Sequence, residues 1–179
     1  MNQLEQIERE SSARGLPFLL IGGFAVIQHG YARYTEDLDL MIARESAAAW
    51  RDMLTALGYR LFHEEQTFIQ FTPPSPASQP VDLMLANPST FAGLLAASGT
   101  TRMQGADLKV VSLEHLIALK LHVLKQGRLH RFLKDFEDVA QLIRLNNLDL
   151  NSAPWRGLFL RYGTAELLDK LQRASRAGA

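Results

Sequence analysis

The stretch Thr35-Glu36-Asp37-Leu38-Asp39-Leu40-Met41-Ile42 decides the fold that the sequence predicts. It reads as a buried β-strand, except that two carboxylates stand two residues apart in it. Successive strand residues point to opposite faces, so Thr35, Asp37 and Asp39 share one face. Leu38, Leu40 and Ile42 line the other face. Two like charges held side by side at the start of a core strand repel each other and resist desolvation. A divalent cation, which takes carboxylate oxygens as ligands, makes that arrangement tolerable, so the stretch predicts a functional site.

A glycine pair, Gly22-Gly23, precedes this strand and follows a compact apolar strand expected over residues 18–21. Glycines there let the backbone approach a ligand closely, and the start of the next helix offers free N–H groups to an anion such as a triphosphate. Arg33 and Thr35 add a cation and a hydroxyl beside the acids. Taken alone, the pair is better explained as a tight turn without a ligand. The alternatives for Arg33 are a surface residue and a neutralising partner of Glu36. Beside the acids, the pair predicts a phosphate-binding loop.

A third acid, Asp82, stands in a later apolar strand expected over residues 81–85. If that strand neighbours the one with Asp37 and Asp39, the three acids converge on one spot. Such a cluster can hold one or two Mg²⁺ ions that clamp the attacking and leaving oxygens of a phosphoryl displacement. The third acid can also take the proton of an incoming hydroxyl. The competing interpretation makes Asp37 a cap, Asp39 an edge-strand surface residue and Asp82 a salt-bridge partner.

A lysine falls within the apolar stripe of a helix expected over residues 113–126. Lysines are almost never fully buried unless they are paired. Lys120 therefore either reaches a cleft, where its point charge would neutralise phosphate, or extends its ammonium to the surface. The stripe is formed by Leu113, Leu116, Ile117, Leu121, Val123 and Leu124.

The following helix, expected over residues 131–146, carries an aspartate on the flank of its apolar face. This position allows Asp135 to pair with Lys120 across two antiparallel helices. The alternative is a set of ordinary surface pairs four residues apart, namely Arg131 with Asp135 and Lys134 with Asp138.

The composition limits the 179-residue chain to one ordinary domain with room for a small helical appendage. Lysine plus arginine balance aspartate plus glutamate at 19 each, which argues against a dedicated nucleic-acid binder because such proteins carry a basic excess. The absence of cysteine excludes disulfides, thiolate zinc sites and a cysteine nucleophile. No hydrolase elbow, Walker loop or dinucleotide-binding glycine motif occurs. No apolar stretch is long enough to span a bilayer and no secretory signal is apparent, so we expect a soluble, cytoplasmic protein.

The periodicity along the chain predicts an α/β half followed by an α-helical half. A proline-rich surface loop is expected over residues 73–80, and residues 86–106 give no clear pattern. Helices are expected over residues 3–13, 24–29, 46–57, 113–126, 131–146 and 164–176, and strands over residues 18–21, 37–43, 59–63, 67–72, 81–85 and 108–111.

These motifs resemble the nucleotidyltransferase superfamily that includes DNA polymerase beta. The family pattern is a glycine pair, an Asp-x-Asp about a dozen residues later and a third acid on a following strand, here Gly22-Gly23, Asp37-Leu38-Asp39 and Asp82. The stretch from Ile21 to Asp39 is most similar to small bacterial members, which are the lincosamide-type antibiotic nucleotidyltransferases and the abortive-infection-type toxins of toxin–antitoxin systems. In the toxin-like branch a helix lysine and a later aspartate complete the site, and Lys120 and Asp135 match them by position.

The resemblance, which covers about residues 18–143, implies an α+β fold. A nucleotidyltransferase-like mixed β-sheet with flanking helices would span residues 1–111, and a C-terminal helical part would span residues 112–179. The implied reaction is the Mg²⁺-dependent transfer of an NMP from an NTP to a hydroxyl acceptor with release of pyrophosphate. We expect Asp37, Asp39 and Asp82 to bind the metal, Gly22, Gly23, Arg33, Thr35, Lys120 and Asp135 to bind the nucleotide, and Asp37, Asp39, Asp82 and Lys120 to serve catalysis.

The acceptor stays open at this point: a small molecule such as an antibiotic, a tRNA 3′ end and a protein side chain all suit the same donor chemistry. An antitoxin partner is a further possibility implied by the toxin-like branch. Two alternatives compete with the enzyme. One is a non-catalytic nucleotide-binding regulatory module of the same fold, and the other is a structural interaction protein whose acids form surface salt bridges.

Overall fold

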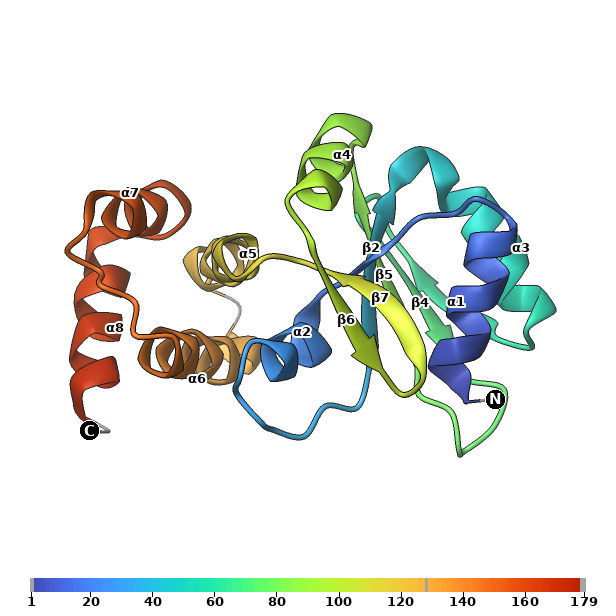
Figure 1. Cartoon of the computed structure of the whole chain (residues 1–179), viewed down its shortest axis with the longest axis horizontal. Coiled ribbons are helices and arrows are strands. Elements are labelled where there is room, and N and C mark those ends of the chain that lie inside the picture. Colours follow the sequence, from blue (N-terminus) through green and yellow to red (C-terminus); the bar gives the residue numbers. More distant parts are fainter. Residues whose placement is uncertain (1, 128, 178–179) are drawn as a thin grey trace. The chain divides into compact units, whose positions relative to one another are not determined.

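The structure, a computed structural model of the chain, describes residues 2–127 and 129–177 (Figure 1). The chain divides into two compact units. The first comprises residues 1–25 and 33–112, and the second comprises residues 26–32 and 113–179. The division after Ser112 falls one residue from the boundary expected at 111, but the segment 26–32, which was expected in the α/β half, belongs with the helical unit.

A seven-stranded mixed sheet forms the centre of the first unit. Its strand order is β3-β4-β5-β2-β1-β7-β6. β2 runs parallel to β5 and β1 runs parallel to β7, while the other neighbouring strands are antiparallel. The strands are β1 (Leu19–Leu20), β2 (Leu38–Ala43), β3 (Arg60–Glu64), β4 (Phe68–Thr72), β5 (Val81–Ala86), β6 (Gly99–Met103) and β7 (Ala106–Val110).

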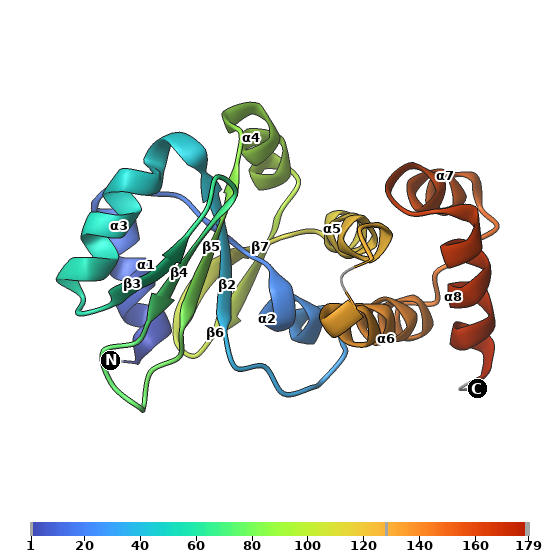
Figure 2. The ribbon, with the colours of Figure 1, turned by 180° about the vertical axis from the view of Figure 1, so that it is seen from behind.

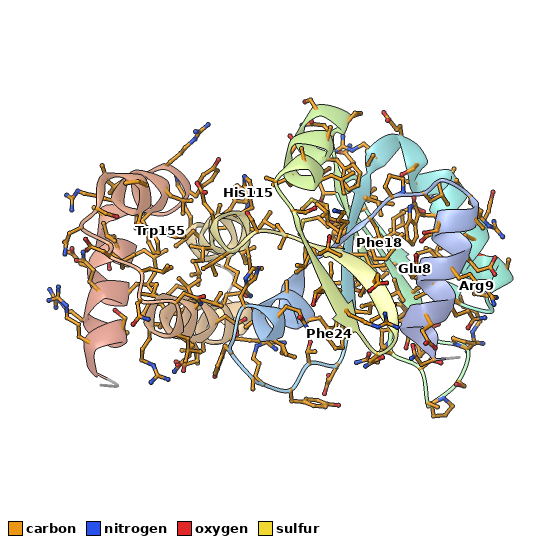
Figure 3. The ribbon with its side chains drawn as sticks, viewed as in Figure 1. Glu8, Arg9, Phe18, Phe24, His115 and Trp155 are labelled. Carbon is orange, nitrogen blue, oxygen red and sulfur yellow. The ribbon has the colours of Figure 1, made fainter. Side chains whose placement is uncertain are left out.

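One face of this sheet is entirely apolar in its central strands. Leu38, Leu40 and Ile42 alternate along β2 onto that face and are almost fully buried. Helices α1 (Gln3–Ala13) and α3 (Ala47–Ala56) lie side by side in both Figure 1 and Figure 2. The ring of Phe18, labelled in Figure 3, meets Trp50 of α3 edge-on at 5.5 Å. Phe18 lies two residues before Leu20, the register partner of Leu40, so α3 covers the apolar face and the carboxylates of β2 are on the other one.

The second unit is built from helices that pack through leucine-rich faces. α5 contacts both α6 and α7, and α8 contacts both α6 and α7. The segment 26–32 is tied to these helices through Asn146, whose Nδ2 donates to the carbonyl oxygen of His29 at 3.0 Å. The helices are α5 (Leu113–Lys125), α6 (Leu129–Leu145), α7 (Ala153–Tyr162) and α8 (Ala165–Ala177).

The structure confirms the predicted α+β class with a mixed sheet, flanking helices and C-terminal helices. It adds three elements that the sequence patterns did not predict: α4 (Pro88–Ala96), β6 and α7. α2 (Gly22–Gln28) begins at the glycine pair itself, two residues earlier than expected, and the single turn η1 (Arg44–Ser46) leads into α3. Within residues 2–127 and 129–177, no helix is long and apolar enough to span a bilayer.

Candidate active site

Asp39 and Asp82 are brought together by the register of two parallel neighbouring strands. Asp39 of β2 is the direct partner of Asp82 of β5, and the residues on either side of them pair in the same register. Neighbouring strands lie about 4.8 Å apart, and partners in register point to the same face. Both carboxylates are half-buried on the face opposite α3. The predicted convergence of acids from two separate strands is therefore present for this pair.

Gly22 lets the backbone pass directly beside the Asp39 carboxylate. Its φ of +59° lies in the left-handed region that side chains disfavour. A Cβ at this position would overlap the Asp39 side chain. The next backbone N–H, that of Gly23, is 3.4 Å from Oδ2 of Asp39. Gly22 is thus required by a close approach to an acid, which a simple tight turn would not require.

Gly23 stands against the polar segment that precedes β2. A Cβ there would overlap the hydroxyl of Thr35 and would lie 3.2 Å from Nη1 of Arg33. Thr35 is buried, and Nη1 of Arg33 donates to the carbonyl oxygen of Tyr34 at 2.9 Å. The hydroxyl and the guanidinium therefore lie beside Gly23 at the start of α2. A helix start with a nearby cation is a favourable place for phosphate oxygens.

Gln70 joins this group, although the sequence reasoning did not find it. Gln70 of β4 is the register partner of Asp82, so Gln70, Asp82 and Asp39 form one row across three strands. Nε2 of Gln70 donates to Oδ2 of Asp82 at 2.9 Å. The only sequence signal for this residue was a polar side chain at alternate spacing in an otherwise apolar strand.

Asp37 lies one residue before β2 and is half-buried. Among the residues that the structure describes, no three histidine or acidic side chains form a metal-binding group. Mg²⁺ is commonly held by one or two carboxylates together with substrate phosphates and water, so the pair Asp39 and Asp82 fits such an ion. Both donors are hard carboxylate oxygens, and the backbone at Gly22 passes close beside Asp39, where a Cβ would not fit.

Lys120 and Asp135 form the predicted pair inside the second unit. Nζ of Lys120 lies 2.8 Å from Oδ1 of Asp135 and 2.7 Å from Oδ2 of Asp138. Lys120 is only 7% exposed, so the alternative that its ammonium extends to the surface is wrong. Asp138 is fully buried, so its assignment to an ordinary surface pair with Lys134 is also wrong. The side chain of Arg131, the other alternative partner, lies outside the described side chains.

A cavity of about 320 Å³ lies elsewhere in the first unit. It is lined by residues of α1, of the segment that leads to β1, of α4 and of β7. Two of these residues, Glu8 and Phe18, are labelled in Figure 3. No residue of the Asp39–Asp82 row lines it.

Several solved structures with a similar fold are nucleotidyltransferases or are described as similar to them. An antigenic nucleotidyltransferase-like protein from Paracoccidioides brasiliensis matches with a TM-score of 0.61 at 18% identity, over 99% of this chain and 94% of that one. ANT(2″)-Ia in complex with adenylyl-2″-tobramycin matches with a TM-score of 0.60 at 17% identity, over 97% and 95%. The lincomycin-bound lincosamide antibiotic adenylyltransferase LnuA matches with 0.57 at 14% identity, over 81% and 98%. At these identities the likeness establishes the fold.

A family model extends the likeness from fold to sequence. No curated protein matches the chain by sequence. The model of the nucleotidyl transferase AbiEii toxin, described as a type IV toxin–antitoxin system, matches residues 7–177. This match covers most of both units and all the candidate site residues. The chain is therefore a nucleotidyltransferase that belongs to the AbiEii toxin family of type IV toxin–antitoxin systems.

Proposed function

We propose that the protein moves an NMP from an NTP to a hydroxyl acceptor in a Mg²⁺-dependent reaction. The acceptor oxygen bonds to the α-phosphorus, the bond from that phosphorus to the bridging oxygen breaks, and pyrophosphate leaves. The observation that carries the proposal is the in-register pair of Asp39 and Asp82, with the backbone of Gly22 passing close beside Asp39. Two adjacent carboxylates in a half-buried position are a costly arrangement unless a cation or a proton is shared there.

The residues of the first unit would have different roles in this reaction, according to their chemistry. Asp39 and Asp82, with Asp37 at the entrance to β2, supply the carboxylate oxygens for the metal. When bound, Mg²⁺ would offset the negative charge of the triphosphate as the leaving oxygen develops charge. Asp82 also takes the proton of the acceptor hydroxyl. Gly22 and Gly23 let backbone N–H groups approach the triphosphate.

Arg33 and Thr35 hold phosphate oxygens by charge and by hydroxyl donation. The parts expected of Lys120 and Asp135 in nucleotide binding remain a proposal for mutagenesis. The two residues form a buried cluster with Asp138 in the second unit.

The acceptor belongs to one of three classes: a small molecule, a tRNA 3′ end or a protein side chain. ANT(2″)-Ia is described with an adenylylated aminoglycoside and LnuA with lincomycin, which supports small hydroxylated molecules as one class to test. The family description supports a toxic action on the cell, with an antitoxin as partner. We place this action in the cytoplasm, where NTPs and all three acceptors are found.

The test is a label-transfer screen with the full chain. Each α-labelled NTP, ATP among them, is incubated with Mg²⁺ and with total RNA, total protein, an aminoglycoside or a lincosamide. We expect transfer to one acceptor class, and we expect Asp39→Ala and Asp82→Ala each to reduce it by at least about 100-fold, as loss of a group that contacts the reacting phosphate does. Asp37→Ala tests whether the remaining acid is also needed for label transfer. Asp107→Ala is the matched control, because this exposed aspartate lies on β7 away from the row.

Two outcomes would overturn the proposal. One is no transfer from any NTP to any acceptor. The other is unchanged transfer in both Asp39→Ala and Asp82→Ala. Calorimetric titration with NTP and Mg²⁺ then decides the alternative, because tight binding without pyrophosphate release is the behaviour of a non-catalytic nucleotide-binding module.

A further inference from the structure

Gln70 contacts the candidate site through one of its acids. Its side chain reaches across from β4 and donates from Nε2 to Oδ2 of Asp82 at 2.9 Å. The two residues are register partners, so the backbone ladder itself sets the separation of their side chains. Both are half-buried, which places the bond where water competes less than at the surface.

The chemistry of this donor matters as much as its position. Asp82 already has a carboxylate neighbour in Asp39, so a positively charged residue at position 70 would be the usual way to balance the pair. Such a residue would compete with a metal ion for the same oxygens. The amide of Gln70 donates a hydrogen bond without adding charge. It can therefore fix how the carboxylate is turned without itself neutralising the charge of the pair.

We propose that Gln70 is a positioning residue that orients the Asp82 carboxylate toward the divalent cation and the acceptor hydroxyl. This inference rests on the proposed function. Hydrogen-bonding partners of metal-ligating carboxylates set the orientation of the ligand, and their loss typically costs about 10-fold to 100-fold in metal affinity or activity. Gln70 contacts the Asp82 carboxylate and is not proposed to contact the nucleotide. Its loss should therefore change turnover and metal binding more than NTP affinity.

The experiment compares Gln70→Leu and Gln70→Ala with the wild-type chain and with Thr72→Val. Leu fills the space of the amide and Ala vacates it, so a loss common to both comes from the missing donor. Thr72 is on the same strand and face, but its hydroxyl donates to the carbonyl oxygen of Arg60 on β3 and does not pair with Asp82. Binding of Mn²⁺, a spectroscopic substitute for Mg²⁺, is titrated by electron paramagnetic resonance with a non-hydrolysable NTP analogue present, and kcat and KM are measured separately.

We expect both Gln70 variants to weaken Mn²⁺ binding and to lower kcat by about tenfold, with the KM for NTP within about twofold of wild type. Thr72→Val should match the wild type in all three. The role of Gln70 would be overturned if both Gln70 variants bound Mn²⁺ as tightly as the wild type while Asp82→Ala abolished Mn²⁺ binding. The proposed function would still stand in that case. If the wild-type chain itself neither binds Mn²⁺ nor transfers label, the proposed function fails and the role of Gln70 falls with it.

Discussion

At Gly22 the positive φ and the lack of room beside the α-carbon both disfavour a side chain. Comparison with Gly15 separates these two effects. Gly22 has φ +59° and a Cβ there would overlap Asp39. Gly15 has almost the same φ, +62°, but a Cβ there would meet nothing within 4 Å. Gly22→Ala and Gly15→Ala should therefore each lose about 1 kcal/mol of unfolding free energy to backbone strain.

Only Gly22→Ala should also displace the Asp39 carboxylate, and a displacement near 1 Å can cost about 100-fold in turnover. The measurement is urea denaturation of both variants together with label transfer and Mn²⁺ titration. If Gly15→Ala lowers label transfer as much as Gly22→Ala, the loss comes from backbone strain. The close approach of Gly22 to Asp39 then has no special role in transfer.

Lys120 balances two buried carboxylates, so its charge should contribute strongly to the stability of the second unit. Nζ lies within 2.8 Å of both Asp135 and Asp138. Lys120→Met keeps the length of the side chain but removes the positive charge beside the two buried acids, which should cost about 3–5 kcal/mol of unfolding free energy. Urea denaturation followed by circular dichroism measures the loss.

Lys170→Met provides the matched control for Lys120→Met. Lys170 pairs with Glu166 four residues away at 2.7 Å, but both side chains are exposed. An exposed helical pair of this kind contributes little to stability, because water screens both charges. Similar small losses in the two variants would mean that the buried cluster is not held by the ammonium charge.

The candidate site shows which residues a sequence can reveal. Asp39, Asp82 and the glycine pair were predictable because each breaks a local rule: an acid in an apolar strand, or two glycines between a strand and a helix. Gln70 breaks no such rule, because a polar residue at alternate spacing is ordinary on a half-exposed strand face. Its role depends on strand register, which is set by long-range pairing.

Asn87 is the residue that starts α4, and its loss should weaken that helix. Its Oδ1 accepts from the backbone N–H of Thr90 at 2.8 Å, and Pro88 follows it as the first helical residue. Asn87→Ala should cost about 1 kcal/mol of unfolding free energy, since the capped N–H loses its partner.

Ser152→Ala is the contrasting variant for this prediction. Ser152 occupies the equivalent position before α7, but its side chain makes no capping bond there and donates instead to the carbonyl oxygen of Asp149. Thermal denaturation of both variants measures the two losses, and Ser152→Ala should lose less stability than Asn87→Ala. A larger loss in Ser152→Ala would show that capping is not what stabilises α4.

The two helices that the sequence did not predict, α4 and α7, have start signals but weak periodicity. Asn87-Pro88 before α4 and Ser152 with Pro154 before α7 are both typical of helix starts. The residues of α4 are mostly small, so no amphipathic stripe marks the helix, and β6 is an exposed edge strand without an apolar alternation. Strands and helices with one strongly apolar face, such as β2 and α5, were predicted within two residues at either end.

At the scale of the whole molecule, the assignment of residues 26–32 to the helical unit could not be read from local patterns. The chain leaves the first unit after Ala25 and returns to it at Arg33. The contact of His29 with Asn146 joins residues 117 positions apart in sequence. Local periodicity carries no information on such a pairing, because it depends on how distant helices fold back.

The stability of the molecule in alkaline solution should depend on one tyrosine. Burial raises the pKa of Tyr59 to about 12, compared with an ordinary value of 10. Below pH 10 the phenol is neutral in both the folded and the unfolded chain and its contribution is constant. Between pH 10 and 12 the unfolded chain loses this proton while the folded chain retains it, so the unfolding free energy falls as pH rises, by up to about 2–3 kcal/mol.

Comparison with Tyr59→Phe isolates this contribution from the other groups that titrate above pH 9. Urea denaturation at intervals from pH 8 to 12 gives the difference in unfolding free energy between the two proteins at each pH. Because Phe cannot ionise, the wild-type chain should lose stability relative to the variant as pH passes from 10 to 12, and the difference should be flat below pH 10. A flat difference across the whole range would mean that Tyr59 ionises in the folded protein as readily as in the unfolded chain, and that its burial does not hold the proton.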